Sequence, residues 1–189
     1  MQIKTGSQFL VLTLFLAVLA FPASAQSRDN HLTPQEVELI QEAQVLDKRI
    51  EIFIKAAERR MLVLAGTQAA DPKQMKKDAQ AWGELPTGSR AELLEDVAKI
   101  LEEAITNIDD VSMHDEKNPL LAKALRKLAA AANQIAGQLT PLREQAKTAA
   151  ELGSIEQALE NSQMILDAAN KLPPANETEK GKGKTKKPN

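Results

Sequence analysis

One amphipathic pattern, from Thr33 to about Ala65, constrains the fold more than any other feature. Thr33, Pro34 and Glu36 fit an N-cap, a first helical position and the closing residue of a capping box. Apolar residues then recur at intervals of four and three, as in a bundle seam: Leu39, Ala43, Leu46, Ile50, Phe53, Ala57 and Leu64. The charged Arg60 is the exception on this seam. A second apolar set widens the stripe, so we predict one helix over 33–65 with neighbours on more than one side.

An irregular link, residues 66–90, follows this helix. Its pattern predicts a short helix over 73–81, after which turn residues break the chain: Gly83, Pro86 and Gly88. Trp82 and Leu85 lie in this link. Either Trp82 covers one end of the bundle, or it is an exposed aromatic anchor, in which case Trp82 and Leu85 are candidate partner-binding residues.

Three more helices are predicted after the link. The second starts at Ser89, with a capping box, and frays between Asp110 and His114; the third starts at Asn118-Pro119. Pro141 either kinks the third helix, or Thr140 caps a new one. The fourth starts at Gly153-Ser154 and stops before Pro173-Pro174. The prediction is an all-α, antiparallel up-down four-helix bundle with a long link after its first helix.

The first residues predict export. Residues 1–25 combine Lys4, an apolar run over 9–21 and an Ala-Ser-Ala cleavage site, which is the pattern of a cleavable signal peptide. We therefore expect a periplasmic or secreted protein. Residues 26–172 would form the helical domain, and residues 173–189 a disordered tail rich in lysine.

Composition narrows the classes of partner. The chain has no cysteine, which excludes disulfides and thiolate metal sites. The predicted body, residues 26–172, has 18 basic and 24 acidic residues, a balance that argues against nucleic acid as its partner. The tail has five lysines against two glutamates, so a weak contact with an anionic surface is one alternative and a purely solubilising role is the other. A heptad-like seam also suits self-association.

The most suggestive polar cluster surrounds His114. Asp110 and His114 are four residues apart and share a helix face if the helix persists, and Asp115 follows. Carboxylates with one imidazole can bind a divalent cation or a small ligand. The alternative is a solvated acidic turn. Lys123, Arg126 and Lys127 form a basic face that we expect to be a mixed solvent face near Glu102, Glu103 or Glu144.

Motifs for catalysis or a cofactor are missing from the sequence. It has no Glu-x-x-His pair for a di-iron bundle, no Gly-x-Ser-x-Gly elbow and no phosphate-binding glycine loop. Met61 and Met164 are expected to fill the core. We therefore predict no enzyme activity and no cofactor.

Two five-residue segments begin with the same pair of residues, at Leu32-Thr33 and at Leu139-Thr140. They resemble the Leu-Thr-x-x-Gln repeats found at helix starts in periplasmic helical stress chaperones, but their fifth residues are Glu36 and Arg143. The likeness covers about ten residues. Together, the sequence predicts an exported non-enzymatic helical bundle that acts through protein contact as a structural, assembly or chaperone-like factor.

Overall fold

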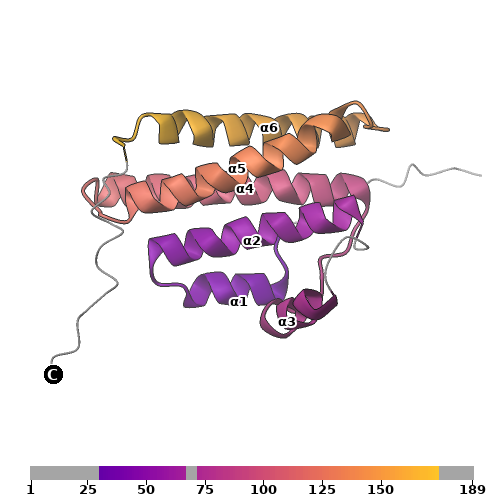
Figure 1. Ribbon diagram of the computed structural model, residues 1–189, viewed down its shortest axis with the longest axis horizontal. Helices are drawn as coiled ribbons and strands as arrows, with labels where there is room; N and C mark the ends of the chain where they lie inside the picture. Colours follow the sequence, from indigo (N-terminus) through magenta and orange to yellow (C-terminus); the bar gives the residue numbers. More distant parts are fainter. Residues whose placement is uncertain (1–29, 67–71, 175–189) are drawn as a thin grey trace, which may run out of the picture.

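The computed structural model describes residues 30–66 and 72–174, and these residues form six helices and no strand (Figure 1). The helices are α1 (Pro34–Glu42), α2 (Leu46–Ala65), α3 (Pro72–Trp82), α4 (Arg90–His114), α5 (Leu121–Arg143) and α6 (Ala149–Asn170). The expected signal peptide and residues 175–189 of the expected tail lie outside the described residues. No helix in the described part of the chain is long and apolar enough to cross a membrane.

The long helices pack in layers. α4 and α5 contact each other, and both contact α2 and α6; α1 packs against α2 (Figure 1). The buried residues of the four long helices form one aliphatic core cluster, in which Phe53 is the only aromatic side chain. Its largest fully buried apolar members are Ile50, Phe53, Leu94, Ile100, Leu101, Leu128, Ile135, Leu139, Ile155 and Ile165. The chain is therefore all-helical and bundle-like, as the seams predict.

The predicted single helix over 33–65 is wrong, because the chain reverses at residues 43–45 (Figure 1). α1 starts as predicted: Thr33 Oγ1 accepts from the Glu36 amide and the Glu36 carboxylate accepts from the Thr33 amide. It ends at Glu42, and the Arg49 side chain donates to the free Ala43 carbonyl across the reversal. No sequence signal marks this break. The reversal lets Glu36 contact α2, as described below.

Two other helix boundaries differ from prediction. α4 continues through His114 instead of fraying from Asp110. α5 starts at Leu121 because Asn118 accepts from the Leu120 amide within a preceding turn. Of the two alternatives at Pro141, a new helix capped by Thr140 is wrong, because α5 continues past Pro141 to Arg143.

The predicted start of the last helix at Gly153-Ser154 is also wrong. α6 begins at Ala149, where Thr148 Oγ1 accepts from the Glu151 amide and the Glu151 carboxylate accepts from the Lys147 amide. This earlier cap satisfies the first free amides of the helix. Gly153 then lies inside α6 without the positive φ of a chain break.

Candidate functional site

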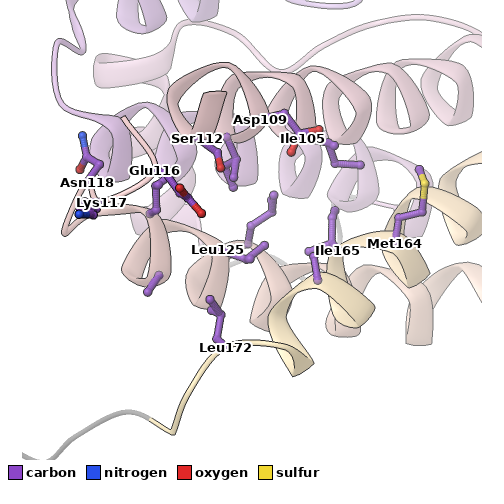
Figure 2. A pocket seen from close by; sticks show the side chains of 15 residues that line it. Ile105, Asp109, Ser112, Glu116, Lys117, Asn118, Leu125, Met164, Ile165 and Leu172 are labelled. Atoms are coloured by element: carbon purple, nitrogen blue, oxygen red, sulfur yellow. The ribbon is translucent and has the colours of Figure 1, made fainter. Parts of the chain in front are cut away.

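An apolar pocket of about 510 Å³, here called the end pocket, opens where α4 and α6 finish and α5 begins (Figure 2). Its floor belongs to the core and consists of buried Ile108, Leu128 and Ile165. Its walls are less buried apolar side chains, including Ile105, Leu121, Leu125 and Leu172. The pocket is thus a place where the described chain leaves part of its core open.

Small residues explain why the end pocket is hollow. Ala122 of α5 and Ala168 of α6 both line it, at positions where larger side chains would narrow the space. Met164 also lines it and is 47% exposed. The prediction that Met61 and Met164 both fill the core therefore holds for the buried Met61 and is wrong for Met164.

One side of the end pocket is polar. Its polar lining comes from the last turns of α4 and the turn that follows: Asp109, Ser112, Glu116, Lys117 and Asn118. In Figure 2 the Glu116 carboxylate turns inward beside Ser112, whereas the Lys117 side chain lies on the outer side. An apolar floor with a polar edge is the usual composition of a binding pocket.

A second hollow, the link cleft of about 580 Å³, lies between the start of α1, residues 82–87 and α4. Trp82 and Leu85, the candidate partner-binding residues, both line it and both are half-buried. Buried Arg60 and Asp96 also line this cleft. The link cleft therefore brings the candidate aromatic residue next to buried charges.

Those charges form a buried cluster around Glu36, which is 0% exposed. Glu36 Oε1 accepts from Arg59 Nη1 at 2.9 Å and from Arg60 Nη1 at 2.6 Å. Arg60, which is 1% exposed, also donates to the carbonyls of His31 and Ala56 and lies 3.6 Å from Asp96. Two carboxylates and two guanidinium groups balance one another, which a buried set of charges requires.

Arg59 ties the link to the cluster. Its guanidinium donates to the backbone carbonyls of Trp82, Gly83 and Glu84, and it lies 5.9 Å from the centre of the Trp82 ring. Burial lowers the pKa of Arg59, and the charge of Glu36 opposes that shift. Gly83 adopts a φ of 69°, which suits glycine and lets consecutive carbonyls face Arg59. These contacts hold Trp82 against the body of the protein.

The acidic turn at His114 is exposed. His114 Nδ1 lies 2.7 Å from the Asp110 carbonyl oxygen and 3.5 Å from its carboxylate. Asp115 caps α4 through its backbone amide, which donates to Val111. Asp110 and His114 thus meet, but no group of three or more His, Cys, Asp or Glu side chains in the described ranges is arranged to hold a metal ion.

The basic face of α5 has other partners than expected. Lys123 and Lys127 contact buried Asp47 at 2.6 Å and 3.1 Å, and Lys127 also contacts Glu51. The hydrogen bond from Lys123 lowers the pKa of Asp47, and that from Lys127 lowers the pKa of Glu51. These lysines therefore join α5 to α2 through ion pairs.

Comparison with known proteins adds no relative. No protein family model, curated protein or solved structure matches this chain significantly.

Sequence reasoning missed the end pocket and the buried cluster. The pocket depends on how three helix ends meet, which no local pattern records. Arg60 did carry a signal, since it stood alone on an apolar seam, and a charge on a core face is a candidate for a buried ion pair.

Proposed function

We propose that this chain is an exported, non-enzymatic helical protein that acts through contact with another protein, as a structural, assembly or chaperone-like factor. We also propose that α2, α4, α5 and α6 form an antiparallel up-down four-helix bundle. The packing of α4 and α5 against both α2 and α6 supports this arrangement.

The observation that carries the proposal is the open end pocket. Its floor is continuous with the core, and two exposed methionines lie at the same end: Met113, at 78% exposure, and Met164. Exposed apolar surface next to polar side chains is typical of surfaces that bind other proteins. Methionine is common on such surfaces because its flexible side chain adapts to the partner.

Site-specific photo-cross-linking in the exported fraction of the cell tests this proposal. A photo-reactive residue at Met113 or Met164 should yield one discrete cross-linked protein, or a broad set of clients for a chaperone-like factor. Leu152, exposed near the start of α6, is the matched control and should yield neither. Absence of the protein from the exported fraction, or equal cross-linking at all three positions, would contradict the proposal.

The same experiment at Trp82 and Leu85 tests the link. A cross-linked partner at Trp82 but not at Met164 would move the contact surface from the end pocket to the link cleft.

A second candidate function is binding of a small ligand at the acidic turn after α4. The observation that favours it is that Ser112 and Glu116, which flank His114, line a pocket of a size that suits small ligands. Calorimetric titration of the wild type and of His114→Ala tests this function. The ligands are calcium, zinc and copper salts and decylammonium, a small amphiphile with an alkyl chain and one positive charge. A stoichiometric heat that is lost in the variant would support this function.

A further inference from the structure

The end pocket has an apolar floor and a polar edge with two carboxylates, so it suits a ligand that carries both an apolar and a cationic group. We propose that it receives an aliphatic side chain of a partner protein, and that a lysine or arginine beside that side chain pairs with Asp109 and Glu116. This inference rests on the proposed function, because it specifies the chemistry of the protein that would be contacted.

The floor and walls of the end pocket are apolar. Three core residues lie at the bottom of the pocket, and half-buried Leu121, Leu125 and Leu172 surround them. An entering aliphatic side chain would complete the packing of this core and remove apolar surface from water on both partners. An aliphatic group suits this part of the pocket because its apolar lining, among the described residues, consists of Ile, Leu, Ala and Met side chains without an aromatic ring.

The edge of the end pocket that the end of α4 forms carries two carboxylates. Asp109 and Glu116 line the pocket, both are exposed, and neither forms an ion pair within residues 30–66 and 72–174. Other carboxylates of the fold, such as Asp47 and Glu36, are already paired. Lys117 is the one cationic side chain that the described part of the chain places in the lining, and its outward direction in Figure 2 leaves the Glu116 carboxylate available.

Backbone dipoles add to the same field. α4 and α6 both end at the pocket, and the carbonyl end of a helix carries partial negative charge. The start of α5 opposes this with one amide end. Two carbonyl ends and two carboxylates therefore favour a cation at the edge of the pocket, next to the apolar floor.

The lysine-rich segment of the chain itself does not fit both the apolar floor and the charged edge. Residues 175–189 begin three residues after Leu172 and contain five lysines, but they contain no Leu, Ile, Val, Met or aromatic residue. This segment could supply a cation but no apolar anchor. A separate protein that carries both groups fits the pocket better.

The test is a random-peptide display selection against the folded chain. Ala168→Trp fills the pocket and serves for counter-selection, and Ala122→Phe fills it from α5 if the first variant does not fold. We expect the enriched peptides to carry Leu, Ile, Val or Met within four residues of Lys or Arg. Their affinity should fall at least tenfold in the filled variant.

Titration of an enriched peptide then tests the charged edge. The double variant Asp109→Asn/Glu116→Gln should lose at least threefold in affinity and much of its salt dependence. Glu144→Gln is the matched control, since Glu144 also follows a helix end but lies at the far end of α5, and it should bind as the wild type does. The proposal is overturned if the double variant and Glu144→Gln lose the same affinity for the peptide. It is also overturned if the enriched peptides contain no basic residue.

The remaining outcomes separate this inference from the proposed function. No enrichment of any peptide overturns the inference, and binding of decylammonium in that case assigns the pocket to a small amphiphile. A discrete cross-link at Met164 with a partner insensitive to Asp109→Asn/Glu116→Gln would leave the proposed function standing while removing the charged contact. Loss of both the cross-link and the peptide would remove both proposals.

Discussion

Glu36 Oε1 and Arg59 Nη1 lie 2.9 Å apart, although 23 residues separate them in the sequence. In one continuous helix the two residues would be about 34 Å apart, since each residue adds 1.5 Å. The reversal at residues 43–45 brings them together and folds α1 onto α2. This ion pair therefore fixes where α1 lies.

Replacement of Glu36 should be strongly destabilising. Glu36→Ala leaves Arg59 and Arg60 buried with less compensation, and loss of one partner of a buried ion pair costs about 3–5 kcal/mol. Urea unfolding followed by circular dichroism measures the change. Glu38→Ala, an exposed position on the same helix, should stay within about 0.5 kcal/mol of the wild type. Similar losses in the two variants would contradict the buried role of Glu36.

Arg59→Lys should loosen the link while the long helices remain folded. Lysine keeps the charge but loses the planar fork that reaches three carbonyls of residues 82–84. Trp82 is the only tryptophan, so its fluorescence reports this change directly. We expect a red-shifted emission and faster proteolysis after Trp82, with nearly unchanged helix content. An unchanged emission spectrum would show that Arg59 does not hold Trp82 in place.

The start of α6 can be tested with two alanine variants. Thr148→Ala removes the N-cap and should cost about 1 kcal/mol in the free energy of unfolding. Ser154→Ala should cost much less, because Ser154 lies inside the helix. Chemical denaturation measures the free energy of unfolding of both variants. A larger loss in Ser154→Ala than in Thr148→Ala would favour a helix that begins at Gly153-Ser154.

Stability should depend on pH through Asp47. Its pKa is lowered in the folded state by the hydrogen bond from Lys123, so its stabilising contribution is complete above its ordinary pKa, about 3.9. That contribution is lost as the pH falls from about 5 through the lowered pKa. Asp47→Asn should therefore be less stable than the wild type at pH 7, and the difference should shrink between pH 5 and pH 3.

Urea titrations at several pH values measure this dependence. Glu160→Gln, at an exposed position on α6, is the control and should follow the wild-type curve. A constant difference between wild type and Asp47→Asn across the whole range would argue that the effect of the substitution is steric.

Local patterns predicted the helical class and much of the packing. Seam residues such as Ile50, Leu101 and Leu128 are buried as expected, and the capping boxes at Thr33 and Ser89 are confirmed. These features depend on residues within a few positions of one another, and for that reason a sequence reveals them.

The errors have a common origin in contacts between distant residues. The break at residues 43–45 accompanies the contact of Glu36 with Arg59, 23 residues away. The partners of Lys123 and Lys127 lie on α2, more than 70 residues away. At α6 two competing caps were present, and Thr148 prevailed over Ser154. The end pocket depends on three helix ends, so its residues could not be selected from the sequence.

The buried cluster has a consequence for how the protein opens. Glu36, Arg60 and Asp96 belong to three helices, and Arg59 adds the link, so none of these segments can leave without exposing an unpaired charge in the others. A nine-residue helix such as α1 would be marginal in isolation. Joined in this way, it should exchange its amide hydrogens together with α2 and α4, as one cooperative unit, and at a free energy of opening well above that of a surface helix.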